Sequence, residues 1–561
     1  MSGFSGILLF NKQLSEKLKR FSFPEKLHGY YTNSYQVMSQ DFSLRCYNNG
    51  KFSRDALVLK NDDRLLGFDG INLMKTKFEE IIDFTSFVNT IGTLKGAFTC
   101  VYKEEKKQQI ALFADHTGSK QIFYYWNSSF FAFSSSIFLL TDVLRHFDVQ
   151  LTISIPASYM ILSLGYLLED YTLVSEIKKV QAGHYVSADR TGMKIQKYHD
   201  YYRNIMYNKL TKELLVELNG RFKRSIELEY EKDKEYGFTH IATLSGGLDS
   251  RLNVMFAHQY GYKDITCLTF GEGFKSDELT ARKIAGELAL KHTVLLLNKG
   301  CHLYDVETPL ILNNCSAYYF GSAQALAAAK QLNFSAHGLL HNGILAESSK
   351  GTYLAGKEHS APELDRHFRI SEQFFNRLDT GLLTNIFQKY NTHEMFITYN
   401  RGFNAAHNGS WVAMPFTDSV YTYMDLDFAE LAYSIHPKLR YRGFLTVEWI
   451  KKLNLEACNF PWQRGIKPTN NQLRILLAKV YYRLKLILTQ KHDISFPFNE
   501  WFSANPHLFE FVKNVFDSTS SWEIIPNEIR KDMRRLILNC SVEEKLLCIS
   551  YLKSIELIFV R

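Results

Sequence analysis

A six-residue string, Ser245-Gly-Gly-Leu-Asp-Ser250, constrains the fold of this chain more than any other feature. Residues 238–244 before it form an apolar run of strand length, and residues 251–259 after it predict a helix that ends at Gly261. Two adjacent glycines let backbone N–H groups approach an anion, and the helix dipole adds partial positive charge. The pattern predicts a phosphate-binding turn between a strand and a helix. Asp249 would repel a bare phosphate, so its presence indicates a bridging Mg²⁺.

The pattern of predicted elements changes near residues 198–209, which we take as a domain boundary. The 561 residues exceed one ordinary core and favour two main domains. Before the boundary, short β-type runs such as 130–133 are separated by turn formers, which indicates packed antiparallel sheets. After it, helices and strands alternate, which indicates a parallel sheet covered by helices. We predict an α/β protein with domains at 1–200 and 210–470 and a helical extension at 471–561.

Composition and cysteine placement limit the kinds of partner. Apolar residues make up 46% of the chain and charged residues 22%, as in soluble globular proteins. The net charge of +8 is modest, and without a basic cluster we expect no nucleic-acid partner. The eight cysteines contain no C-x-x-C motif, which argues against zinc clusters and disulfide scaffolds. With no signal-peptide pattern in residues 1–7, we expect a cytoplasmic protein.

Residues 473–488 predict an apolar helix that contains four cations, Arg474, Lys479, Arg483 and Lys485. A basic helix of this kind could lie on an anionic lipid surface. Its apolar residues, however, surround the predicted helix instead of forming one face, which is typical of a buried helix with snorkelling cations. We therefore expect this helix to be buried, and we expect no membrane partner.

The string Ser245-Gly-Gly-Leu-Asp-Ser250 resembles the pyrophosphate loop of the ATP pyrophosphatase superfamily, and specifically that of the asparagine synthetase family. Residues 269–277 resemble the second strand and loop of that family, and residues 342–353 resemble its metal-binding loop in part. The resemblance implies an adenine nucleotide α-hydrolase-like domain that binds ATP and Mg²⁺. It implies an ATP site made of Leu244, Ser245, Gly246, Gly247, Asp249, Ser250, Phe270, Gly271 and Gly343. It assigns the Mg²⁺ ligands to Asp249 and Glu347.

Two later segments bear on catalysis and on the substrate. Residues 411–418 resemble an R-V-P-F-L-D segment beside the acyl acceptor of the family, but Trp411 and Ala413 replace its charges, so the substrate need not be aspartate. Residues 461–467 lie where the family places a lysine. Loss of pyrophosphate and collapse of an oxyanion develop negative charge, which a desolvated cation stabilises. The predicted catalytic residues are Lys467, with Arg464 as the alternative cation, and Glu347.

The first half resembles a class II glutamine amidotransferase, which implies an N-terminal-nucleophile αββα sandwich. Residues 1–7 resemble the M-C-G-x-x-G-I start of that family, and the strings at 114–125 and 131–135 follow in the same order. Ser2 stands where the nucleophilic cysteine is expected, and a serine hydroxyl is a far poorer nucleophile than a thiolate. Asp69 replaces the oxyanion-hole asparagine, and the glutamine-binding H-R-G-P-D string is missing. We predict that glutaminase activity is absent.

Three functions are compatible with these features. The first is an amide-forming ligase that adenylates aspartate or a related acid, uses ammonia, and releases AMP and pyrophosphate. The second is an amine-accepting relative, similar to the β-lactam synthetases and lasso-peptide cyclases. The third is a catalytically degenerate binding or scaffold protein. The expected partners are a small-molecule or peptide carboxylate and a nitrogen donor, and a homodimer is compatible with the sequence.

Overall fold

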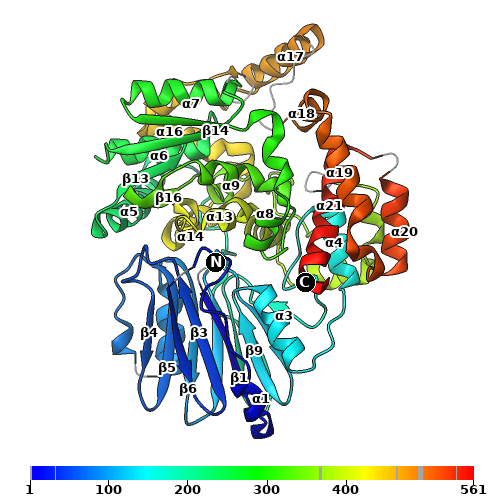
Figure 1. The fold of residues 1–561 in the computed structure, drawn as a ribbon. Coiled ribbons are helices and arrows are strands. Elements are labelled where there is room, and N and C mark those ends of the chain that lie inside the picture. Colours follow the sequence, from blue (N-terminus) through cyan, green and yellow to red (C-terminus); the bar gives the residue numbers. More distant parts are fainter. Residues whose placement is uncertain are drawn as a thin grey trace.

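The computed structural model describes residues 3–31, 33–81, 83–273, 275–364, 369–462, 465–489, 497–537 and 540–560. Within these ranges, two antiparallel sheets lie at one end of the molecule, and a parallel sheet with its helices lies above them in the view of Figure 1. Helices within residues 498–555 pack along one side of both parts (Figure 1). The predicted α/β class is confirmed.

The first antiparallel sheet has the strand order β10-β8-β9-β1-β3-β2. Its strands are β1 (Gly3–Leu9), β2 (Asn33–Met38), β3 (Phe42–Asn48), β8 (Phe123–Trp126), β9 (Phe130–Ser134) and β10 (Lys178–Lys179). The second sheet has the order β12-β11-β7-β6-β5-β4. Its strands are β4 (Leu57–Lys60), β5 (Arg64–Asn72), β6 (Gly96–Glu104), β7 (Gln109–Ala114), β11 (His184–Ala188) and β12 (Met193–Lys197).

Alternating side chains pack these two sheets face to face. On β7, Ile110 and Leu112 join a core with residues of the first sheet, whereas Ala111 and Phe113 face the outer helix α2 (Phe84–Thr93). This alternation follows from the period of two along a strand. The helix α3 (Ile137–His146) covers the outer face of the first sheet, and the next helix, α4 (Ile155–Leu164), packs against the C-terminal helices. The layers are therefore helix, sheet, sheet and helix, and the predicted αββα sandwich is confirmed.

The parallel sheet has the strand order β15-β14-β13-β16. Its strands are β13 (Thr239–Thr243), β14 (Ile265–Gly271), β15 (Lys291–Leu296) and β16 (His337–His341). The helices α5 (Lys212–Glu235), α6 (Leu248–Gln259) and α7 (Ser276–Glu287) cover one face, and α9 (Ala323–Lys330) covers the other. Because β14 and β16 lie on opposite sides of β13, the strand order reverses at β13. Ligands of open parallel sheets bind at the carboxyl ends of strands beside such a reversal.

The C-terminal helices pack against the N-terminal half. The helix α21 (Val542–Ile555) contacts α4, and the hydroxyl of Tyr551 donates to Ser158 Oγ at 3.0 Å. Both helices belong to one hydrophobic core, and they lie side by side in Figure 1. The division into 1–200, 210–470 and 471–561 stays a prediction, but part of its last segment is joined to its first.

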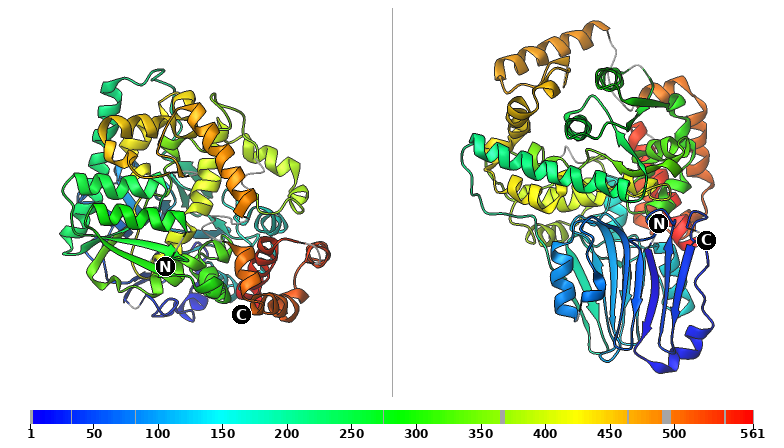
Figure 2. Two further views of the ribbon diagram at one scale, coloured as in Figure 1. Left: turned by 90° about the horizontal axis from the view of Figure 1, so that it is seen from above. Right: turned by 90° about the vertical axis from the view of Figure 1, so that its left-hand side faces the viewer.

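The prediction of a buried helix at 473–488 is wrong. The helix α17 (Gln472–Thr489) lies at the end of the molecule farthest from the antiparallel sheets (Figures 1 and 2). Of its described side chains only Ala478 is buried, and Leu473 and Tyr481 are exposed by 64% and 67%. The helix is exposed because it lies at the edge of the molecule, where only a narrow strip of its surface contacts the rest of the chain. In the part of the chain that the structure describes, no helix is long and apolar enough to span a membrane.

Candidate active site

A cavity of about 410 Å³ lies at the carboxyl ends of β13, β14 and β16. Six of the nine residues predicted to bind ATP line it, and they are Leu244, Ser245, Asp249, Ser250, Phe270 and Gly343. Of the other three, Gly246 and Gly247 belong to the adjoining turn, and Gly271 is the last residue of β14. The opposite wall is apolar and comes from Ala325, Ala328, Ala329 and Phe334. The cavity therefore combines a polar turn with an apolar wall, as small-molecule sites commonly do.

The predicted phosphate turn is a compact loop between β13 and α6. Gly247 is the N-cap residue, and α6 begins at Leu248. The hydroxyl groups of Ser245 and Ser250 lie 2.9 Å apart, and Ser250 Oγ accepts the N–H of Ser245 at 3.0 Å. The N–H of Gly247 donates to Ser245 Oγ at 3.2 Å. These bonds hold the turn at the positive end of the α6 dipole.

Two glycines allow backbone segments to approach the turn. A Cβ on Gly343 would lie 2.2 Å from the backbone nitrogen of Ser250, and one on Gly246 would lie 2.9 Å from Asp277 Cα. Contacts this short exclude any side chain at either position. Gly343 therefore lets the loop after β16 meet the start of α6, and residues 342–344 of this loop line the cavity.

Arg251 holds the turn in place through its carbonyl oxygens. It was not identified from the sequence as a functional residue. Its side chain is fully buried and donates to the carbonyl oxygens of Gly246 at 2.5 Å and Pro461 at 2.6 Å. It also donates to the carbonyl oxygen of Ala457 at 3.2 Å. Burial lowers the pKa of Arg251 to about 10. A buried guanidinium bonded to carbonyls fixes the loop, and the only sequence signal was a cation directly after the motif.

Lys350 is a second cation that reaches the phosphate turn. Its Nζ lies 2.6 Å from Asp249 Oδ2. Burial opposes the charged form of Lys350, but the charge of Asp249 raises its pKa above the ordinary value. Sequence reasoning missed Lys350, although it falls within residues 342–353 and three residues after Glu347. That spacing puts both side chains on one face of the short helix α10 (Glu347–Lys350).

Glu347 completes a cluster with Asp249 and Lys350. Its Oε1 accepts the hydroxyl of Thr352 at 3.3 Å, and its Oε2 is buried without a hydrogen-bond partner among the described residues. Burial and the nearby charge of Asp249 raise the pKa of Glu347. Two carboxylates and one ammonium group therefore meet beside the phosphate turn.

The first choice for the catalytic cation, Lys467, is not brought to this cluster. Lys467 is exposed and does not line the cavity. Arg464 and Ser2 lie outside the described residues, so their assignments stay predictions. The exposure of Lys467 follows from its place in the turn around Gly465, where the N–H of Trp462 donates to the carbonyl oxygen of Ile466 at 2.6 Å.

The segment 411–418 faces two ways. Ala413 lines the cavity. Trp411 is fully buried against the N-terminal half, where its Nε1–H donates to the carbonyl oxygen of Ser119 at 2.8 Å. Trp411 therefore joins the two halves and does not face the cavity.

Asp69 is held in a buried ion-pair network between the halves. Lys120 Nζ lies 3.2 Å from Asp69 Oδ2 and 2.7 Å from Asp418 Oδ1, and all three side chains are buried. A separate cavity of about 260 Å³, lined in part by Gly3, Asn48 and Asp69, lies between the two antiparallel sheets. The residue at the predicted oxyanion-hole position is thus a charged, paired carboxylate.

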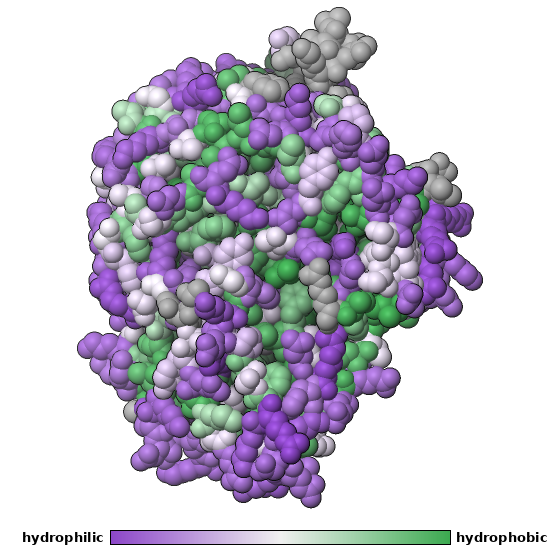
Figure 3. Space-filling model, viewed as in Figure 1, coloured by the Kyte–Doolittle hydropathy of each residue, from purple (hydrophilic) through white to green (hydrophobic). Residues whose placement is uncertain are grey.

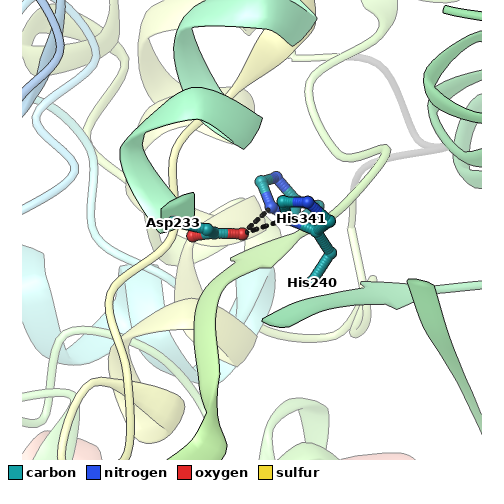
Figure 4. Close-up of side chains that lie close together, drawn as sticks. All are labelled: Asp233, His240 and His341. Atoms are coloured by element: carbon teal, nitrogen blue, oxygen red, sulfur yellow. Dashed lines mark hydrogen bonds and ion pairs between the residues drawn. The ribbon is translucent and has the colours of Figure 1, made fainter. Parts of the chain in front are cut away.

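A buried cluster of ionisable groups supports the end of β16. His240 Nδ1 and His341 Nε2 each lie 2.8 Å from Asp233 Oδ2, and the three side chains converge in Figure 4. His341 Nδ1 also lies 3.4 Å from Glu229 Oε2. Burial disfavours the charged imidazole, but Asp233 raises the pKa of His341 to about 9. The atoms of Asp233, His240 and His341 that could bind a metal ion lie within 4.8 Å of one another. Hydrogen bonds already join these atoms, so we interpret the cluster as structural support for the loop that begins at Asn342.

Comparisons with known proteins agree with this architecture. Residues 86–199 match the family described as a glutamine amidotransferase domain. Over 192 residues the chain is 29% identical to a protein of Methanocaldococcus jannaschii named "Putative asparagine synthetase (glutamine-hydrolyzing) 2". That match covers 33% of this chain and 35% of the other protein, so the chain spans about a third of the length of this curated relative.

Two solved structures show weaker likeness. One is titled the allosteric regulatory enzyme of purine biosynthesis. It is 10% identical to this chain with a TM-score of 0.21, and the match covers 52% of this chain and 74% of that one. The other is a glutamine phosphoribosylpyrophosphate amidotransferase from B. subtilis complexed with ADP and GMP, at 10% identity and a TM-score of 0.22, over 52% and 75%. The matched family and the αββα sandwich show that the N-terminal half contains a glutamine amidotransferase-like domain, and over about a third of its length the chain is similar to a putative asparagine synthetase.

Proposed function

We propose that the protein is an ATP-dependent ligase that adenylates a carboxylate and converts it to an amide, releasing AMP and pyrophosphate. The observation that carries this proposal is the cavity at the carboxyl ends of the parallel strands, lined by the turn between β13 and α6. Its volume of about 410 Å³ falls in the range of small-molecule sites.

The chain supplies separate surfaces for the parts of the substrates. The backbone of residues 245–250 and the α6 dipole would bind the phosphates of ATP. The apolar wall formed by α9 and Phe334 would exclude water from the reacting carboxylate. Lys350 would supply positive charge beside the departing pyrophosphate, which is the task that the sequence assigned to Lys467 or Arg464.

Asp249 and Glu347 would hold Mg²⁺. They fit a hard cation because they offer carboxylate oxygens, and Glu347 Oε2 is buried without a partner in the described part of the chain. When bound, Mg²⁺ would neutralise charge that develops on the phosphates. Lys350 now contacts Asp249 Oδ2, so the ammonium and the metal would compete for this oxygen.

We propose that nitrogen comes from ammonia or an amine and not from glutamine. The support is the pairing of Asp69 with Lys120, because an ion-paired carboxylate is a poor replacement for the amide of an oxyanion hole. Ala406, Gly409 and Ala413 in the cavity wall have small side chains, which favours an acyl substrate larger than aspartate. A larger acyl substrate favours, as the second candidate function, a ligase that uses an amine in place of ammonia.

A degenerate binding protein is the third candidate. The observation that favours it is the ion pair between Lys350 and Asp249, because a protein cation already neutralises the predicted metal ligand. Binding of ATP without turnover would be the signature of this alternative.

Isothermal titration with ATP and Mg²⁺ tests the site itself. We expect the wild-type protein to bind ATP. The variant Gly343→Val should bind ATP at least tenfold more weakly, because a side chain at this position meets the backbone of Ser250. Gly356→Val is the matched control, since a Cβ at Gly356 meets nothing within 4 Å. Failure of the wild-type protein to bind ATP, or equal binding by Gly343→Val, would show that the cavity is not the nucleotide site.

A further inference from the structure

The helix α17 presents an apolar face to solvent. Six of its side chains are between 49% and 67% exposed, and they are Leu473, Leu476, Leu477, Val480, Tyr481 and Leu484. We call this set the apolar face of α17. Its spacing of three and four residues puts all six side chains on one side of the helix.

This concentration differs from the rest of the surface. On the face seen in Figure 3, hydrophilic residues predominate and hydrophobic residues form several smaller areas between them. Among the described residues, 20 large apolar side chains are exposed, and the six of the apolar face of α17 fall within the 12 residues 473–484. Scattered exposed apolar residues need no explanation, whereas a contiguous group marks an interaction site.

Cations flank the apolar face of α17 on both sides. At about 100° per residue, Arg474 lies to one side of Leu473 and Arg483 lies to the opposite side of Leu484. Both arginine side chains are exposed. The sequence of α17 contains four cationic residues and no acidic residue. The helix therefore presents an apolar strip with positive charge along both edges.

We propose that α17 binds the surface of an anionic lipid bilayer, with its axis in the plane of the interface. Such a surface offers hydrocarbon to the apolar strip and phosphate groups to the flanking arginines. A second copy of α17 fits less well, because pairing would bring cations together with no acidic residue on the helix to neutralise them. Binding would be peripheral, since no described helix is apolar enough to cross a membrane.

The position of α17 suits this contact. The helix lies at the end of the molecule opposite the antiparallel sheets in two perpendicular views (Figures 1 and 2), so a planar surface can approach it without meeting those sheets. The inference replaces the expectation that the protein has no membrane partner. It rests on the exposure of α17 and is independent of the proposed ligase activity.

Flotation of the full chain with lipid vesicles tests the proposal. We expect the protein to float with vesicles of phosphatidylcholine and phosphatidylglycerol in equal parts, and to float weakly or not at all with phosphatidylcholine alone. The double substitution Leu476→Glu with Leu477→Glu should abolish flotation. Met206→Glu, at a side chain 71% exposed in another part of the chain, should leave it unchanged.

Charge and folding controls sharpen the result. Arg474→Gln and Arg483→Gln should each weaken binding to the anionic vesicles about fivefold, and added salt should weaken wild-type binding. Circular dichroism should show unchanged helix content and melting temperature in every variant. No flotation of the wild-type protein would overturn the proposal, and so would equal flotation with both lipid compositions. A dimer that is lost in the double variant, without lipid binding, would identify a second copy as the occupant and would also overturn it.

Discussion

Lys350 Nζ lies 2.6 Å from Asp249 Oδ2, so a cation from the loop after β16 neutralises the acidic residue of the phosphate turn. Both side chains are only partly exposed, at 20% and 26%. The contact joins two segments that are 101 residues apart in sequence. It offsets the charge of one of the two carboxylates beside the turn, and it determines how the site should respond to metal.

Lys350→Met should increase the affinity of the nucleotide-free protein for Mg²⁺ by roughly tenfold, because Asp249 loses its competing cation. Isothermal titration with MgCl₂ measures this affinity. Lys330→Met is the matched control, since Lys330 forms an ion pair with Asp305 at 2.8 Å away from the cavity lining. Unchanged Mg²⁺ affinity in Lys350→Met would remove Asp249 from the metal assignment.

Arg251→Met should destabilise the protein by about 3 kcal/mol, because buried carbonyl oxygens lose a charged donor. Urea unfolding gives this value. At a temperature where the variant remains folded, its ATP affinity should also fall, since Arg251 fixes Gly246 in the phosphate turn. Arg224→Met, at an exposed position on α5, serves as the control. A variant with lower stability and unchanged ATP affinity would show that Arg251 has no role in positioning the turn.

His341 should make stability depend on pH in the alkaline range. Its pKa of about 9 in the folded protein exceeds the ordinary value of 6.5, so its contribution is complete below pH 6.5 and is lost as the pH rises through about 9. His341→Gln should therefore cost about 3 kcal/mol more at pH 6 than at pH 10. Urea unfolding at both pH values measures the difference, and His507→Gln, at an exposed histidine, is the control. An equal cost at both pH values would contradict a charged His341 in the folded state.

Lys120→Met should destabilise the contact between the two halves by about 3 to 5 kcal/mol, because it leaves Asp69 and Asp418 buried without their cation. Thermal unfolding followed by circular dichroism detects the loss. Adding Asp69→Asn to Lys120→Met should restore part of the stability by removing one buried charge. Lys106→Met, at an exposed ion pair with Asp63, should have little effect. If the double variant is no more stable than Lys120→Met, the charge of Asp69 is not the cause.

Local patterns predicted the elements well. The strand expected at 238–244 is β13 (Thr239–Thr243), and the helix expected from 251 begins slightly earlier, at Leu248. These elements depend on periodicity and on a glycine turn, both of which are local in sequence. The αββα sandwich could be predicted for a related reason, because each strand alternates its faces, and the family resemblance supplied the order of the layers.

Features that depend on distant contacts could not be predicted. Lys350 reaches Asp249 only because Gly343 lets two loops meet, and Trp411 joins the halves because it meets the backbone of Ser119. We predicted that α17 is buried because it contains many apolar residues, and this prediction is wrong. Burial depends on which elements lie beside a helix, and the sequence of the helix does not show this. Lys467 was favoured by resemblance alone, and the turn around Gly465 leaves it exposed.

Exchange of labelled pyrophosphate into ATP tests the proposed adenylation most directly. The protein is incubated with ATP, Mg²⁺, labelled pyrophosphate and a panel of amino-acid, peptide and other small carboxylates, without a nitrogen donor. Adenylation predicts that label enters ATP in the presence of at least one carboxylate and that Asp249→Asn abolishes the exchange. ATP binding without exchange across the whole panel would contradict the ligase assignment and favour a nucleotide-binding protein that performs no adenylation.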